Sequence, residues 1–84
     1  ARGQGVGGGS GADFYVVRGL APGDTLNVRS RASTQGTVIA RLAQGTRVRN
    51  LGCEVVGQTR WCRIRTTGAV EVTGWVNGRY LREG

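Results

Sequence analysis

The feature that most constrains this chain is the shortness of its apolar runs. From Phe14 onward, these runs are separated by glycine or polar turn residues, and none extends into the periodic stripe of an amphipathic helix. Residues 26–29 alternate apolar and polar side chains, with Leu26 and Val28 placed to face a core. Residues 21–24 (Ala-Pro-Gly-Asp) form a strong turn signal. The pattern predicts an all-β domain.

The predicted strands are short and closely spaced. They cover residues 14–18, 26–29, 38–42, 46–51, 61–65, 70–72, 74–76 and 80–81. Asn50 breaks the alternation after Val48, which indicates either a bulge that returns Leu51 to the core or a poorly formed strand end. Residues 54–60 are longer than a tight turn, so we expect the hairpin tip to project. Closing such strands into a small barrel protects their edges.

The chain is long enough for one small domain. Of its 84 residues, residues 1–13 are rich in glycine and show no strand or helix period, which predicts a flexible tail or linker. Residues 14–84 then form a single domain with a thin core. No apolar stretch approaches the roughly 20 residues that cross a membrane. No signal-peptide core is present either, so an exported form is expected to be a mature chain or an excised fragment.

Two cysteines, Cys53 and Cys62, leave two interpretations open. Their spacing is not a CxxC motif, and neither histidine nor a third cysteine is present to complete a zinc site, so no metal is expected. Cys53 ends one strand-like run and Cys62 lies in the next, so an antiparallel hairpin would place them opposite each other for a disulfide. That bond would persist in the periplasm or outside the cell, which indicates an extracytoplasmic location. Two free thiols in a cytosolic protein are the alternative.

The composition disfavours an enzyme. The chain contains neither His nor Lys, so the usual proton shuttles and Schiff-base chemistry are excluded, and its five acidic residues are scattered. We therefore expect no catalytic residues and no cofactor.

Several motifs resemble the bacterial SH3-like domain family over nearly the whole folded part. They are Leu26-Asn27-Val28-Arg29-Ser30, Val38-Ile39, Leu42, Gly45-Thr46, Val48, Leu51-Gly52, Trp61, Arg63-Ile64, Gly74-Trp75-Val76 and Tyr80-Leu81. The resemblance implies an SH3-like barrel of five to seven short, strongly bent strands. It also implies a non-catalytic targeting or binding module, since relatives are attached to cell-wall hydrolases or lie in periplasmic proteins. Several relatives bind peptidoglycan or its peptides.

The cysteine-bearing stretch adds to this resemblance. Cys53 and Cys62, with the residues around them, are similar to a branch of the family found in exported bacterial proteins. The loop after Arg29 departs from the family, because residues 31–34 replace the usual Gly-Pro. This departure argues against transferring a relative's ligand directly.

Trp61 is the first candidate ligand contact. It alternates with Cys62 and Ile64, so we expect it on the outward face, partly exposed beside Arg63 and Arg65 and suited to stacking on a ligand. The alternative is that Trp61 packs under the stems of these arginines.

The other candidates lie at the ends of the domain. Tyr15 and Tyr80 lie near opposite ends of the folded chain, where closure of a barrel would bring them together, and each is a candidate ligand contact. Arg29 either contacts a ligand or, as the favoured interpretation, braces the following loop through backbone carbonyls. Trp75 is expected to be structural.

Three functions remain open. The first is an envelope module that docks on cell-wall peptide or on another envelope protein, as a monomeric domain. The second is a basic small barrel that binds nucleic acid, since the net charge is +7 and all twelve basic residues are arginine. The third is a structural interaction domain of a larger exported protein. The arginines fall on nearly every strand, with a denser stripe at Arg63 and Arg65, which favours an anionic or peptide partner near one strand face.

Overall fold

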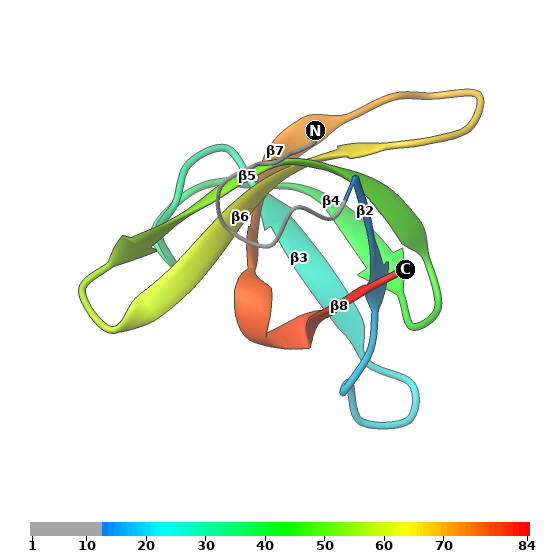
Figure 1. Ribbon diagram of the computed structural model, residues 1–84, viewed down its shortest axis with the longest axis horizontal. Helices are drawn as coiled ribbons and strands as arrows, with labels where there is room; N and C mark the ends of the chain where they lie inside the picture. The colour runs from blue at the N-terminus through cyan, green and yellow to red at the C-terminus, as the bar shows by residue number, and fades with distance from the viewer. Residues whose placement is uncertain (1–12) are drawn as a thin grey trace, which may run out of the picture.

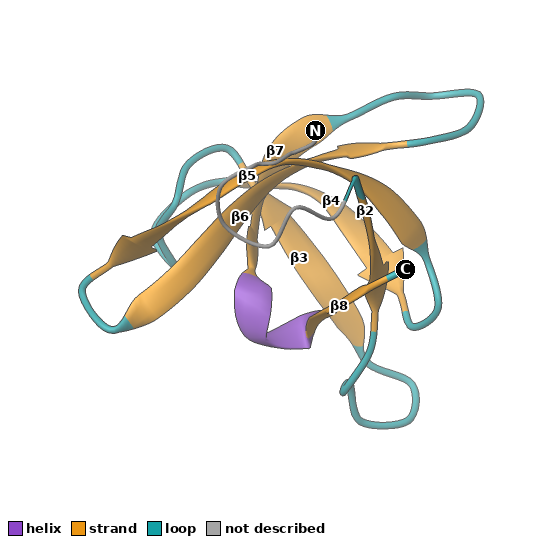
Figure 2. Ribbon diagram, viewed as in Figure 1, coloured by secondary structure: helices purple, strands orange, loops and turns teal. Residues whose placement is uncertain are grey.

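The computed structural model describes residues 13–84. The predicted flexible tail falls almost entirely on residues 1–12, which lie outside the described residues. The described chain is built from strands and one short 3₁₀ turn (Figure 2). The elements are β2 (Phe14–Val17), β3 (Thr25–Arg29), β4 (Val38–Ala43), β5 (Arg47–Val56), β6 (Thr59–Thr66), β7 (Thr73–Asn77), η1 (Gly78–Tyr80) and β8 (Leu81–Glu83). The all-β prediction is confirmed.

All seven strands belong to one antiparallel sheet. Its order is β4-β3-β7-β6-β5-β2-β8, so β3 pairs with both β4 and β7, and β2 lies between β5 and β8. The sheet is strongly curved, and β8, the last strand along the chain, returns to lie beside β2, the first strand of the described residues (Figure 1). This arrangement brings the two ends of the folded chain together and wraps the strands around one core, as the SH3-like barrel prediction requires.

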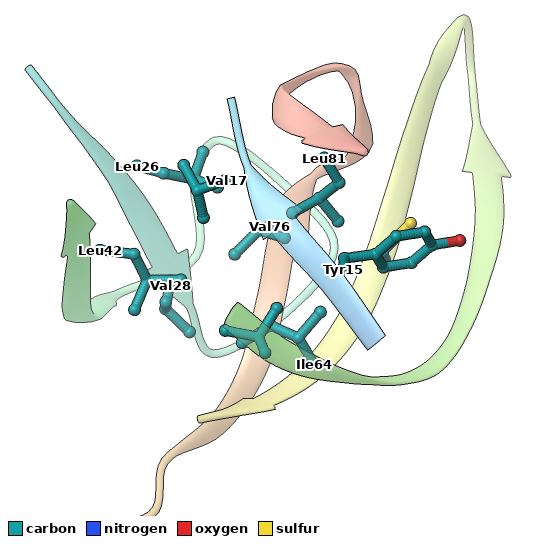
Figure 3. Close-up of a cluster of buried hydrophobic side chains, with 10 residues drawn as sticks. Tyr15, Val17, Leu26, Val28, Leu42, Ile64, Val76 and Leu81 are labelled. Atoms are coloured by element: carbon teal, nitrogen blue, oxygen red, sulfur yellow. The ribbon is translucent and has the colours of Figure 1, made fainter. Parts of the chain in front are cut away.

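The core comes from alternate residues of most strands. Leu26 and Val28 are buried as predicted, with relative exposures of 5% and 0%. The cluster also contains Tyr15, Val17, Leu42, Val48, Cys62, Ile64, Val76 and Leu81. Figure 3 shows these side chains converging from strands on opposite sides of the sheet's curve. No polar or charged residue of the described chain is buried.

The β5–β6 hairpin is longer and tighter than predicted. Its strands continue to Val56 and Thr59, so the turn contains only Gly57 and Gln58, and Gly57 adopts a φ of 64°. Residues 51–58 are all exposed, and the hairpin projects from the body of the domain (Figure 1). The projection was predicted correctly, but its cause is strand length rather than a long loop.

The bulge predicted near Asn50 is present. The register between β5 and β6 shifts between Asn50 and Gly52, and the Asn50 side chain accepts a hydrogen bond from the Gly52 amide at 2.8 Å. Leu51 is 40% exposed, so the expectation that the bulge returns it to the core is wrong. A second difference concerns residues 70–72, which belong to the loop between β6 and β7 rather than to a strand.

The disulfide joins the two strands of the projecting hairpin. Cys53 and Cys62 are direct cross-strand partners and form a disulfide bond, which confirms the pairing prediction. Cys62 is fully buried, whereas Cys53 is exposed and lies 3.7 Å from the hydroxyl of Tyr15. The bond therefore ties the projecting part of the hairpin to the core.

Among residues 13–84, no helix is long and apolar enough to span a membrane.

Candidate functional site

A hollow of about 260 Å³ lies on the outer side of the sheet. Its sheet residues include Asn27, Trp61 and Asn77. Each of them is next to at least one core residue of its own strand, so these three occupy outward positions of β3, β6 and β7. The β2–β3 loop contributes Leu20, and η1 contributes Tyr80. The hollow is therefore assembled where a loop and a 3₁₀ turn approach the outer face of three adjacent strands.

Trp61 lines this hollow but is not exposed as predicted. It occupies the outward face of β6, yet only 4% of its surface is accessible, and it lies outside the main core cluster. The outward face at this point is bordered by Leu20 and Tyr80 instead of open solvent. The alternation correctly placed Trp61 opposite Cys62, but the expected exposure is wrong because other segments border it. Only a small part of the indole is available to a ligand.

Tyr80 is positioned by the turn that precedes β8. The Asn77 side chain accepts a hydrogen bond from the Arg79 amide at 3.0 Å, which starts the 3₁₀ turn. The Tyr80 carbonyl accepts a bond from the Arg18 amide at 2.9 Å, which fixes the turn against the start of the β2–β3 loop. The guanidinium of Arg79 lies 5.5 Å from the Tyr80 ring centroid. Tyr80 is half-buried, so part of its ring faces the hollow.

Two opposite charges border the same hollow. Arg29 lines it, and its Nη1 donates a hydrogen bond to the Gly36 carbonyl at 3.0 Å. This bond braces the β3–β4 loop, as the favoured interpretation of Arg29 predicted. Asp24 also lines the hollow, from the turn closed by its amide bond to the Ala21 carbonyl at 3.0 Å. An aromatic surface bordered by an acid and a base suits a ligand that carries both charges.

A second, more open hollow of about 410 Å³ adjoins the first at Asn77. It is lined by both Arg60 and Arg79. Arg60 is held in place because its Nη2 donates a hydrogen bond to the Gly78 carbonyl at 3.1 Å. The second hollow therefore places two guanidinium-bearing residues next to the first hollow.

The structure therefore gathers three of the six predicted contact residues. Trp61, Tyr80 and Arg29 line the first hollow, whereas Tyr15 does not, because it is 2% exposed and belongs to the core. Tyr15 therefore has almost no surface to offer a ligand, whereas Tyr80 packs against the core cluster and also lines the hollow.

Arg63 and Arg65 are exposed as predicted, but they lie further along β6 and do not line the hollow. Sequence reasoning missed Asp24, which it took for a turn residue only, and Asn77. The outward alternation of β3 did indicate Asn27, although only as a polar surface residue. The described residues contain no group of three or more His, Cys, Asp or Glu that could hold a metal ion.

Comparison with known proteins gives one match. The family model of the bacterial SH3 domain matches residues 24–82, which include every residue of the first hollow except Leu20. No curated protein and no solved structure matches the chain.

Proposed function

Because the chain belongs to the bacterial SH3 domain family, whose members are generally binding modules, we propose that it is a non-catalytic module of the bacterial envelope that docks on a peptide. The peptide belongs to the cell wall or to a partner envelope protein. The observation that carries this proposal is the first hollow, which is lined by the aromatic residues Trp61 and Tyr80 and by the charged residues Asp24 and Arg29.

The size and chemistry of the hollow favour a short peptide segment. Its volume of about 260 Å³ is below the range of roughly 300–1,000 Å³ that encloses a drug-sized ligand. It therefore suits one or two side chains of a longer ligand that continues along the surface. A peptide amine would lie near Asp24, and a carboxylate would lie near Arg29 or near the arginines of the second hollow.

The extracytoplasmic location is part of the same proposal. The Cys53–Cys62 disulfide supports it, since such bonds persist mainly in oxidising compartments. Thiol counting after aerobic purification tests it: we expect no free thiol until a reductant is added. Two free thiols in the untreated protein would contradict the proposed location.

Binding is tested by titrating the protein with purified stem peptides of peptidoglycan at low salt and recording the amide chemical shifts by two-dimensional NMR. We expect the largest shifts at the amides of Asn27, Trp61 and Asn77. Asp24→Asn should weaken binding several-fold, because Asp24 is the acid among the described residues that line the first hollow. Glu83→Gln is the matched control, since it removes one exposed acid outside that hollow. Absence of any shift with stem peptides would remove the cell-wall form of the proposal.

A further inference from the structure

A second outward surface lies further along the same strands. Arg49 on β5 is directly opposite Arg65 on β6, and Arg63 on β6 is directly opposite Trp75 on β7. These residues alternate with core residues of the same strands, so all four point away from the core. We call Arg49, Arg63, Arg65 and Trp75 the outer arginine face. None of the four lines the first hollow.

The charges of this face are largely uncompensated. Two like charges directly opposite each other on neighbouring strands are destabilising, and Arg49 and Arg65 form such a pair. Arg65 has one acidic partner, with its Nη2 3.4 Å from a carboxylate oxygen of Glu71. Within residues 13–84, neither Arg49 nor Arg63 forms an ion pair. The Arg49 guanidinium lies 5.7 Å from the centroid of the Phe14 ring, which carries no charge to neutralise it. A surface that keeps this repulsion is complementary to an anionic partner.

The spacing of the arginines favours an anionic chain over a single ion. Neighbouring strands lie about 4.8 Å apart, and alternate residues of one strand lie roughly 6.6 Å apart. The side chains of these three arginines therefore leave the sheet at separate points, about 5–7 Å apart. Each guanidinium can bind one phosphate through two parallel hydrogen bonds. A backbone with successive phosphates can therefore give each of the three arginines a phosphate of its own, whereas a single small anion would have to be shared among them.

The presence of Trp75 on this face favours nucleic acid over other polyanions as the partner. It is half-buried, and its cross-strand partners are Arg63 on one side and Arg29 on the other. A partly open aromatic ring on a face that also carries arginines is a stacking surface for a nucleobase. Only unpaired bases can stack on a side chain in this way. A lipid headgroup or an inorganic polyphosphate has no planar ring to place there.

We propose that the outer arginine face binds single-stranded nucleic acid, with its phosphates on Arg49, Arg63 and Arg65 and one base stacked on Trp75. This site is separate from the hollow, so the inference does not rest on the proposed peptide function. Arg29 is left out of the site because its guanidinium already bonds to Gly36.

The test is fluorescence anisotropy of a labelled single-stranded oligothymidylate at 50 mM salt. We expect saturable binding, with log K falling against log salt with a slope of about −2, as three phosphate contacts on a single strand require. The double variant Arg49→Gln/Arg63→Gln should lose at least tenfold in affinity. The matched control Arg31→Gln/Arg41→Gln removes the same charge from two other exposed arginines and should lose less than threefold. Equal losses in both variants, or no binding by the unaltered protein, would overturn the proposal.

A second measurement separates nucleic acid from other polyanions. Trp75→Leu, checked for folding by circular dichroism, should lose several-fold in affinity for the oligonucleotide. Inorganic polyphosphate and vesicles of phosphatidylglycerol should compete weakly. If either competes as well as unlabelled oligothymidylate, and Trp75→Leu binds normally, the partner is a base-free polyanion and the nucleic-acid proposal fails.

Discussion

Trp61 and Cys62 are consecutive residues of β6, face opposite sides of the sheet, and are both buried, with relative exposures of 4% and 0%. Cys62 packs in the core and is tied to Cys53, whereas Trp61 lies at the hollow bordered by the β2–β3 loop and η1. β6 therefore connects the core to the candidate peptide site. A change at either residue is expected to affect stability, whatever its effect on binding.

Replacing Trp61 should unfold much of the protein. Truncating a buried tryptophan to alanine costs about 3–5 kcal/mol, close to the whole stability that a core of this size supplies. Trp61→Ala should therefore lose its cooperative thermal transition in circular dichroism. Val55→Ala, at a position that is 69% exposed, should change the free energy of unfolding by less than about 0.5 kcal/mol. A Trp61→Ala variant with an unchanged melting temperature would show that this tryptophan is not structural.

Removing the disulfide should destabilise the fold without changing its topology. The bond closes a loop of about ten residues, which corresponds to about 2.7 kcal/mol in the chain-entropy estimate. Urea unfolding of Cys53→Ser/Cys62→Ser should show a loss of this order, and reduced wild-type protein should behave similarly. If reduction leaves the urea midpoint unchanged, the hairpin is held by its strand pairing and core contacts alone.

Gly74 should not tolerate a side chain. A Cβ atom there would lie 2.6 Å from Cγ1 of Val28 and 2.8 Å from the carbonyl oxygen of Arg29, so β7 and β3 would have to separate. We expect Gly74→Ala to lower the free energy of unfolding by about 1–3 kcal/mol, as overpacking does. Thr73→Ala, at the exposed neighbouring position, is the control. Equal melting temperatures for the two variants would contradict the close approach of these strands.

Arg29 should act on the β3–β4 loop. Arg29→Gln removes the donor to the Gly36 carbonyl, and a hydrogen bond from a charged group contributes about 1.5–3 kcal/mol when buried. Because Arg29 is only half-buried, we expect a smaller loss, of about 1 kcal/mol. Hydrogen exchange should accelerate at Ser30, whose amide bonds to the Thr37 carbonyl across the same loop. Unchanged exchange at that amide would show that Arg29 serves the hollow and not the loop.

Most of the fold could be predicted from the sequence, because the strands and their buried faces show as local patterns of apolar and polar residues. Alternation along residues 26–29 identified the core face of β3, and the break at Asn50 indicated the bulge. Residues 70–72 were misassigned because a short apolar pair resembles a strand whether or not another strand lies beside it. Leu51 was misplaced because a bulge interrupts the period of two on which such assignments depend.

By itself, the sequence determined the strand class and the core face of most strands, and it indicated that Cys53 and Cys62 lie opposite each other, because these depend on alternation and on pairing within one hairpin. The structure then showed that the two cysteines form a disulfide rather than two free thiols. Only the tertiary structure decided that Trp61 is buried and that Asp24 and Arg29 border one hollow. The physical reason is that alternation tells which side of the sheet a residue faces, but not what covers that side. The covering segments, here the β2–β3 loop and η1, are brought there by contacts between residues far apart in the chain.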